Sequence, residues 1–353
     1  MDEQLIQKAK ELVIEAGLKL VKSGLVARTW GNISARVSDT HFVITPKGRG
    51  YETLKPRDIV LLKISDCSYE GDIKPSSEKG IHAAVYRYRQ DVNFVIHTHQ
   101  LNASVLSVLG EGLHVSKEYN DILKDFVPNA AYGISSTKKL AKNAAKAIRD
   151  NPNSVAFLLR SHGAVSVGTS MEEAFNRAFA LEQAAEKEIY RLTDVTSFEE
   201  LRNKYIRQFV AEVNFTPRSI KDIAIPDDIV RLSKSRHIIY DDNLDIAAVS
   251  AAGETIHPYI DDVAQIIGTS IRSGKIEEAI NNLKGRDAVL IKGAGAICVG
   301  ANESEAQAVV MILQKECLCE MLVALTNKGR SLGKIDSWLQ RLVYTRKYSK
   351  LKG

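Results

Sequence analysis

Residues 156–189 read AFLLRSHGAVSVGTSMEEAFNRAFALEQAAEKEI, which joins two short apolar runs to a longer segment with helical periodicity. A small-residue turn separates the two runs, and polar residues after the second run favour a helix start. Ser170 and Glu173 have the spacing of a capping box at that start. We therefore predict a strand, a turn, a second strand and a long helix, in that order.

The same pattern recurs 132 residues later, where residues 288–321 read AVLIKGAGAICVGANESEAQAVVMILQKECLCEM. Asn302 and Glu305 stand where Ser170 and Glu173 stand in the first copy. Among the residues identical in both copies are Gly163, Ala164, Val167, Gly168, Glu173 and Ala174, which recur as Gly295, Ala296, Val299, Gly300, Glu305 and Ala306. Such an internal repeat predicts a second unit related to the first.

A linker is expected between the two copies. Residues 215–228 read FTPRSIKDIAIPDD and contain Pro217 and Pro226, which are typical of a connecting segment. We accordingly expect a first domain over residues 1–215 and a second over residues 216–353. The second is too short to repeat everything that precedes it, so we expect a partial, degenerate copy.

The composition is that of a soluble globular protein and excludes several other classes. The chain has 353 residues, of which 44% are hydrophobic and 26% charged, and these values exclude wholesale disorder. No apolar stretch approaches the roughly 20 residues of a membrane helix, and the N-terminus lacks the order of a secretion signal. The four cysteines are too few and too irregularly spaced for a disulfide framework, which favours the reducing cytoplasm.

The positive charge is concentrated in the C-terminal segment. Residues 328–353 hold eight Lys or Arg and one acid, Asp336, whereas the rest of the chain is close to neutral. We interpret this segment as a solvated helical tail, because a basic run alone is a weak signal for nucleic acid. We expect neither a nucleic-acid nor a membrane partner.

Two histidines end a predicted buried strand. Residues 93–102 read NFVIHTHQLN, and alternation along a strand places His97 and His99 on the same side. Two imidazoles that converge at a strand end supply half of a zinc site. Two unrelated polar residues at the rim of a sheet are the other interpretation, and the commoner one for an isolated His-x-His.

A third histidine occupies a similar place. His162 ends the apolar run before Gly163, at a strand-to-turn junction, and the second copy has Ala294 at this position. The second copy also lacks a His-x-His, since its histidines are His237 and His257. This difference fits a site retained in one copy and lost in the other, although a turn histidine bound only to its neighbours remains the alternative.

A helix start with two hydroxyls lies upstream, where residues 75–89 read PSSEKGIHAAVYRYR. Ser76 or Ser77 is expected to cap this helix, and hydroxyls beside free backbone N–H groups suit a phosphate. Glu78 falls in the expected first turn, where it either interacts with the helix dipole or faces a metal. His82 is a fourth ligand or a partner of a ligand, and we favour the partner.

Two further loops have residues suited to an anion. Gly31 to Ser34 read GNIS, and Thr45 to Gly48 read TPKG. Each loop alone is typical of an ordinary turn.

The motifs GNIS, ITPKG, SSE, HTH and SHG, in this order and at these intervals, resemble the class II aldolase/adducin superfamily. The likeness covers roughly residues 5–210 and favours the L-fuculose-phosphate aldolase and L-ribulose-phosphate 4-epimerase branch. It implies a three-layer α/β/α sandwich with a central, mostly antiparallel sheet, followed here by a smaller related α/β domain. It also implies one Zn²⁺ per chain, bound by His97, His99 and His162.

The resemblance implies roles for further residues. Glu78 is the implied catalytic acid/base, and Tyr119 is the implied proton donor at a neighbouring subunit's site or else a packing residue. The residues that match phosphate-holding positions are Asn32, Thr45, Gly48, Ser76 and Ser77. Lys47 departs from the family pattern, which has a small hydroxyl residue there, so it strengthens phosphate binding, accepts a carboxylate or points to solvent.

The implied reaction is reversible aldol cleavage of a phosphorylated ketose to dihydroxyacetone phosphate and an aldehyde, through a zinc-stabilised enediolate. A 4-epimerase, a dehydratase or a decarboxylase on the same site, and a non-catalytic adducin-like scaffold, are the alternatives. The partner implied is a small sugar phosphate. The resemblance also implies a homo-oligomer, either a dimer that mimics a fourfold tetramer or a tetramer.

Overall fold

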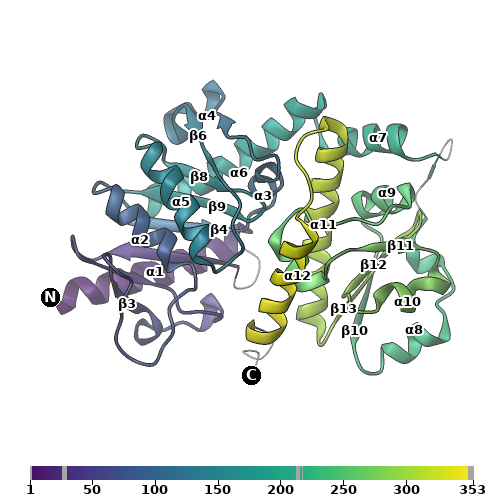
Figure 1. Ribbon diagram of the computed structural model, residues 1–353, viewed down its shortest axis with the longest axis horizontal. Coiled ribbons are helices and arrows are strands. Elements are labelled where there is room, and N and C mark those ends of the chain that lie inside the picture. The colour runs from purple at the N-terminus through teal and green to yellow at the C-terminus, as the bar shows by residue number, and fades with distance from the viewer. Residues whose placement is uncertain (1, 26–29, 212–214, 217, 349–353) are drawn as a thin grey trace. The chain divides into compact units, whose positions relative to one another are not determined.

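The computed structural model describes residues 2–25, 30–211, 215–216 and 218–348 (Figure 1). The chain divides into two compact units, residues 1–188 (the first unit) and residues 189–353 (the second unit).

This division comes earlier than the boundary expected at residue 215. Helix α7 (Phe198–Phe209) packs against helices α9 (Leu244–Ala252) and α11 (Glu303–Thr326), so the segment before the expected linker associates with the second unit. Pro217, one of the two prolines of that linker, lies outside the described residues.

The first unit is built on a seven-stranded sheet. Its strand order is β3-β2-β1-β4-β9-β8-β7, and every pair is antiparallel except β7–β8. The strands are β1 (Gly31–Arg36), β2 (His41–Ile44), β3 (Val60–Lys63), β4 (Phe94–Thr98), β7 (Asn129–Ala130), β8 (Ala156–Leu159) and β9 (Gly163–Gly168). The expectation of a mostly antiparallel sheet is confirmed.

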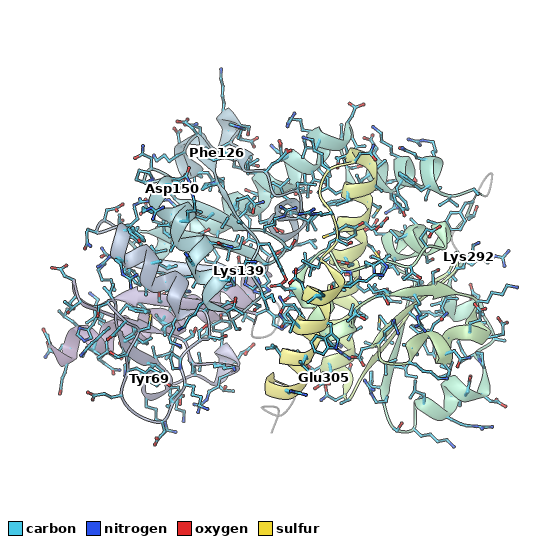
Figure 2. All side chains as sticks on the ribbon, viewed as in Figure 1. Tyr69, Phe126, Lys139, Asp150, Lys292 and Glu305 are labelled. Atoms are coloured by element: carbon cyan, nitrogen blue, oxygen red, sulfur yellow. The ribbon has the colours of Figure 1, made fainter. Side chains whose placement is uncertain are left out.

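Helices cover both faces of this sheet (Figure 1). Helices α1 (Glu3–Ser23) and α6 (Met171–Thr193) share one apolar core with the sheet, and α2 (Lys79–Tyr88) and α5 (Lys138–Asp150) share the other. Figure 2 labels Lys139 and Asp150 near the two ends of α5. The three-layer α/β/α arrangement is therefore confirmed.

Shorter elements complete the first unit. Helix α3 (Leu101–Ser107) follows β4 directly and packs on β8 and β9. Helix α4 (Lys117–Leu123) lies between β5 (Leu113–His114) and β6 (Phe126–Val127), which pair with each other.

The second unit has a smaller sheet of related topology, in the order β10-β13-β12-β11. Its strands are β10 (His237–Asp241), β11 (Arg272–Gly274), β12 (Ala288–Ile291) and β13 (Gly295–Gly300). Helices α8 (Asp227–Leu232) and α10 (Ala279–Leu283) share an apolar core with one face, and α9 and α11 pack together against β13. Helix α12 (Lys334–Val343) follows α11.

The strand order of the second unit matches β4-β9-β8-β7 of the first, and the one parallel pair, β11–β12, matches β7–β8. Phe94 pairs with Gly168 in β4–β9, and His237 pairs with Gly300 in β10–β13. The correspondence thus begins well before the predicted repeat. Strands β1–β3 have no counterpart among the described residues of the second unit.

The predicted order of strand, turn, strand and helix is confirmed in both copies. The hydroxyl of Ser170 accepts the N–H of Glu173 at 3.2 Å, and Asn302 accepts the N–H of Glu305 at 3.0 Å. Figure 2 labels Glu305 in the first turn of α11. The two chemically different caps perform the same function, because each satisfies an N–H that has no partner within the helix.

No helix in the described ranges is long and apolar enough to cross a membrane.

Candidate metal centre

Strand β4 supplies two imidazoles to one side of the sheet. His97 is fully buried in the strand and His99 follows its end, and their Nε2 atoms lie 3.1 Å apart. The His97 Nδ1 lies 2.8 Å from the carbonyl oxygen of Ala164 on β9. Because a carbonyl only accepts, Nδ1 carries the proton and the Nε2 of neutral His97 presents its lone pair.

The turn between β8 and β9 positions the third imidazole. Ser161 adopts a left-handed conformation with φ 59°, and the His162 ring stacks on His97 with centroids 5.1 Å apart. A Cβ on the next residue, Gly163, would lie 2.4 Å from the carbonyl oxygen of Thr98. Only glycine lets the turn approach β4 closely enough to bring the rings together.

Glu78 completes the cluster from the start of α2. Its carboxylate oxygens lie 3.0 Å from His162 Nε2 and 3.1 Å from His97 Nε2. The expected placement of Glu78 in the first helical turn is wrong by one position, because α2 begins at Lys79 and Glu78 precedes it. The expectation that Ser76 or Ser77 caps the helix is also wrong, because Glu78 itself is the cap residue and no side chain among the described residues caps the helix. The Ser76 hydroxyl instead accepts the N–H of Glu78 at 3.2 Å.

Four ligand atoms converge at this point. One each from Glu78, His97, His99 and His162 lie within 4.8 Å of one another. Imidazole nitrogens with free lone pairs and carboxylate oxygens repel each other unless a positive charge lies between them. Three imidazoles and one displaceable carboxylate are a donor set that suits a divalent transition metal such as zinc. The residues present therefore fit a metal.

The electrostatics of Glu78 support an ionised carboxylate. Burial alone would raise the pKa of Glu78, but positive charge on the adjacent His162 and His97 rings, when they are protonated, outweighs burial and holds this pKa well below its ordinary value.

The loops predicted to hold phosphate are partly brought together near Glu78. Thr45 accepts the N–H of Ile33 through its hydroxyl at 3.2 Å and the N–H of Ser76 through its carbonyl at 3.0 Å. Asn32 pairs with His97 across β1–β4 and donates from Nδ2 to Glu78 Oε2 at 3.0 Å. The loops containing these residues therefore border the metal cluster.

The other predicted anion-binding residues lie in the neighbouring turns. The Ser77 hydroxyl lies 2.9 Å from the Ser136 hydroxyl. The backbone N–H of Lys47 donates to the carbonyl of Lys74 at 2.9 Å, and Gly48 has φ +70° with open space where a Cβ would stand.

Tyr119 lies apart from the cluster in the described residues. It is buried on α4, and Lys187 Nζ lies 5.3 Å from the centre of its ring. Lys187 also pairs with Glu118. Within the single chain, the contacts described for Tyr119 are therefore with α6, not with the imidazoles.

One functional loop was not predicted. Residues 133–136, GISS, precede α5, and the Ser135 hydroxyl donates to Glu78 Oε1 at 3.4 Å. The two serines after a glycine resemble the small polar loops that were singled out, so this composition was the available signal. Its distance of more than 50 residues from Glu78 in the sequence concealed its place in the site.

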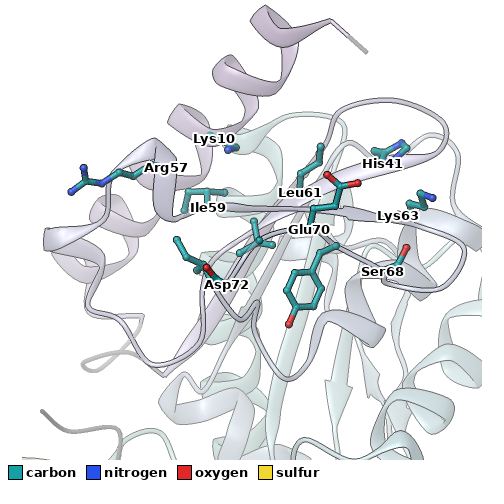
Figure 3. A pocket seen from close by; sticks show the side chains of 13 residues that line it. Lys10, His41, Arg57, Ile59, Leu61, Lys63, Ser68, Glu70 and Asp72 are labelled. Atoms are coloured by element: carbon teal, nitrogen blue, oxygen red, sulfur yellow. The ribbon is translucent and has the colours of Figure 1, made fainter.

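A separate hollow of about 690 Å³ lies beside the edge strand β3 (Figure 3). Its charged side chains are of both signs, since Lys10, Arg57 and Lys63 are positive and Glu70 and Asp72 are negative. None of the predicted site residues lines it. We therefore do not include it in the metal centre.

Comparison with known proteins identifies relatives of the first unit. The family described as Class II Aldolase and Adducin N-terminal domain matches residues 11–189. A 5-deoxy-D-ribulose 1-phosphate aldolase of Bacillus thuringiensis serovar kurstaki is 34% identical over 183 residues, which are 52% of this chain and 84% of that protein. A probable L-ribulose-5-phosphate 4-epimerase of Mycoplasma pneumoniae is 28% identical over 204 residues, 54% of this chain and 84% of the other.

A solved structure named L-fuculose 1-phosphate aldolase is 34% identical and has a TM-score of 0.49, covering 55% of this chain and 92% of its own. The family match ends at residue 189, at the division between the units, so the second unit lies outside it.

Proposed function

The chain belongs to the class II aldolase and adducin family, and from this premise we propose that it is a metal-dependent enzyme that cleaves a phosphorylated ketose. The proposed products are dihydroxyacetone phosphate and an aldehyde. The observation that carries the proposal is the convergence of three imidazoles on the carboxylate of Glu78. The name of the relative from Bacillus thuringiensis, an aldolase for a sugar 1-phosphate, supports the substrate class.

We propose Zn²⁺, one ion per chain, as the metal held by His97, His99 and His162. A bound zinc ion supplies a Lewis acid for the oxygens of the sugar. The hydrogen bond from His97 Nδ1 to the carbonyl of Ala164 fixes the tautomer of this ligand and the direction of its lone pair.

Glu78 is the proposed acid/base. In cleavage a base beside the metal, for which the Tyr119 side chain of a neighbouring chain is the candidate, takes the proton of the C4 hydroxyl. The C3–C4 bond then breaks and leaves its electron pair on C3, which needs a proton. Glu78 supplies that proton, and in the reverse direction removes it. Because the Glu78 carboxylate lies between His162 and His97, the substrate must displace it before Glu78 can transfer the proton.

The hydroxyls of Thr45, Ser76 and Ser77, the side chain of Asn32 and the backbone of Gly48 are the proposed phosphate contacts. A phosphate held here fixes the distance from the reacting carbon to the metal centre. Lys47 lies in the same loop and adds a positive charge that favours an anionic substrate.

We further propose that the second unit is a partial copy of this fold that has lost its metal ligands. The shared strand order and the replacement of His162 by Ala294 support this view. A homo-oligomer, in which Tyr119 reaches the site of a neighbouring chain, follows from the same family pattern. We place the enzyme in the cytoplasm, without nucleic-acid or membrane partners.

A 4-epimerase is the second candidate, because the relative from Mycoplasma pneumoniae is named as one. Both activities break and form a bond between C3 and C4 of a sugar phosphate. They differ in the position of the phosphate and in whether the fragments leave.

The test is a cleavage assay of the full chain with a panel of ketose 1-phosphates, with and without a chelator. Activity that chelation abolishes and zinc restores is expected, whereas activity that survives both chelation and His97→Ala would exclude the metal mechanism. Glu78→Gln should retain the metal and lose turnover. Glu173→Gln, a change at a helix cap of the same unit, is the matched control and should retain turnover. Inversion at C4 of a ketose 5-phosphate without cleavage would favour the epimerase.

A further inference from the structure

A chain of buried hydrogen bonds extends from Glu78 into the layer between β1 and α2. Asn32 and Ser34 are two residues apart on β1, and Glu78, His82 and Tyr86 are spaced four residues apart at the start of α2 and along it. These spacings place each set on one face of its element. The facing side chains therefore meet in pairs across the layer.

Each link in this chain is short. The Asn32 amide contacts Glu78 Oε2 at 3.0 Å through Nδ2 and His82 Nε2 at 2.5 Å through Oδ1. The Ser34 hydroxyl lies 2.6 Å from His82 Nδ1 and 2.8 Å from the Tyr86 hydroxyl. His82 and Ser34 are fully buried.

The chemistry of Glu78 determines the direction of every bond. A carboxylate only accepts, so Asn32 turns its N–H toward Glu78 and its carbonyl toward His82. That carbonyl also only accepts, so His82 carries its proton on Nε2. The Nδ1 of a neutral imidazole is then an acceptor, and Ser34 donates to it.

The far end of the chain follows from the same rule. Since the Ser34 proton is used toward His82, the Ser34 oxygen accepts from the Tyr86 hydroxyl. The Arg36 guanidinium lies 4.8 Å from the Tyr86 ring centre and donates to the Tyr86 carbonyl at 2.9 Å, which holds this residue in place. Burial is the main cause that lowers the pKa of His82 to about 3, so the imidazole stays neutral.

We propose that Ser34, His82 and Tyr86 are positioning residues that hold the Asn32 amide with its N–H, not its carbonyl, toward Glu78. A side-chain amide has nearly the same shape after a half-turn, so only its hydrogen-bond partners select the orientation. The wrong orientation would set a carbonyl oxygen against the carboxylate and weaken its hold between the imidazoles. The effect of the Asn32 orientation on turnover rests on the proposed function, whereas the orientation of the Asn32 amide does not.

The first test is spectroscopic and uses the unmodified full chain labelled with ¹⁵N-histidine. The protein has eight histidines, and His82→Gln identifies the His82 signals by their loss. We expect the Nε2–H tautomer, unchanged between about pH 5 and pH 8, where an ordinary histidine titrates. An Nδ1–H tautomer or a protonated ring in this range would overturn the proposal.

The second test uses matched serine variants. Ser34→Ala removes the donor to Nδ1, and we expect a mixture of His82 tautomers and a kcat lower by about tenfold, with a smaller change in KM. Ser34→Thr keeps the hydroxyl and should restore both readouts. Ser104→Ala is the control, because Ser104 is an equally buried serine of the first unit whose hydroxyl has no partner among the described residues.

Tyr86→Phe provides a variant that leaves Ser34 intact. It removes only the outermost donor, so we expect the His82 tautomer to persist and kcat to fall less than in Ser34→Ala. A Ser34→Ala protein with wild-type kcat and an unchanged tautomer would overturn the positioning role. If the unmodified chain cleaves no ketose phosphate, the proposed function fails instead, and the His82 tautomer in the unmodified chain and in Ser34→Ala still decides the orientation.

Discussion

The β8–β9 turn of the first unit and the β12–β13 turn of the second have the same internal support. Ser161 and Gly293 both adopt left-handed conformations, with φ 59° and 72°. Each donates its N–H to a buried serine on the helix that follows the first matching strand, Ser161 to Ser107 at 3.2 Å and Gly293 to Ser250 at 3.1 Å. The two serines are fully buried at equivalent places in α3 and α9.

Each serine is also connected to the neighbouring parallel strand. The carbonyl of Ser107 accepts the Asn129 amide from β7 at 2.9 Å, and the carbonyl of Ser250 accepts the Ser273 hydroxyl from β11 at 3.4 Å. We call this set of bonds from turn to helix to strand the serine brace. It appears in both units although the residue types differ at two of its three positions, the turn and the strand.

The metal ligands do not recur with the brace. In the second unit Tyr240 and Asp242 stand at the places of His97 and His99, and Ala294 stands at the place of His162. Strands β1–β3, which bring Asn32 and Thr45 to the site, have no counterpart there in the described ranges. The brace therefore recurs with the fold, whereas the proposed metal ligands stand at these positions only in the first unit.

The largest effect is expected from exchanging His162 of the first turn and Ala294 of the second, which stand at equivalent positions. His162→Ala gives the first turn the residue of the second, so we expect the fold to persist while metal affinity falls by at least about 100-fold. Ala294→His should add no second metal, because one imidazole beside Tyr240 and Asp242 does not make a site. Metal content of the purified chain and its circular dichroism check both variants. A second equivalent of metal in Ala294→His would contradict the separation of fold from ligands.

Removing the brace should have a smaller effect that differs between the units. Ser107→Ala leaves the buried N–H of Ser161 without its acceptor, which costs about 1–3 kcal/mol of unfolding free energy, and Ser250→Ala does the same to the half-buried N–H of Gly293 at the lower end of that range. Only Ser107→Ala should also weaken metal binding, by about tenfold, because its turn carries a ligand. Denaturant unfolding and metal titration measure the two effects. Equal metal affinity in Ser107→Ala and Ser250→Ala would mean that the serine brace stabilises the fold but does not position a metal ligand.

Local signals made each residue of the cluster a candidate, and the resemblance of the ordered motifs implied that the candidates form one metal site. His97 and His99 alternate on one strand, His162 ends another strand before a glycine, and Glu78 lies at a helix start. Strand periodicity and junction position are properties of a few adjacent residues. The histidines at the strand ends and the glutamate at the helix start could therefore be found without knowing the topology.

The supporting bonds have no such local signal. Ser34 meets His82 across 48 residues, and Ser107 meets Ser161 across 54. A buried serine on an apolar face looks like any small core residue until the sheet order places its partner beside it. The structural division at residues 188 and 189 differs from the expected domain boundary for the same reason, since the packing of α7 on α9 and α11 leaves no mark in the sequence before Pro217.

The smallest expected effect concerns the helix caps, which are equivalent in the two units and do not touch the metal. Ser170→Ala and Asn302→Ala should each lower the free energy of unfolding of their own unit by about 1 kcal/mol. Metal at 100 times its dissociation constant should stabilise the first unit by about 2.7 kcal/mol. With metal bound, the first unit of Ser170→Ala should then have a higher free energy of unfolding than the first unit of the wild-type chain without metal. Metal should not offset the loss of stability that Asn302→Ala causes in the second unit. Calorimetric unfolding with and without a chelator resolves these cases. If metal raised the unfolding temperature of both units equally, the two units would unfold together. The two turns could then not be compared as independent copies.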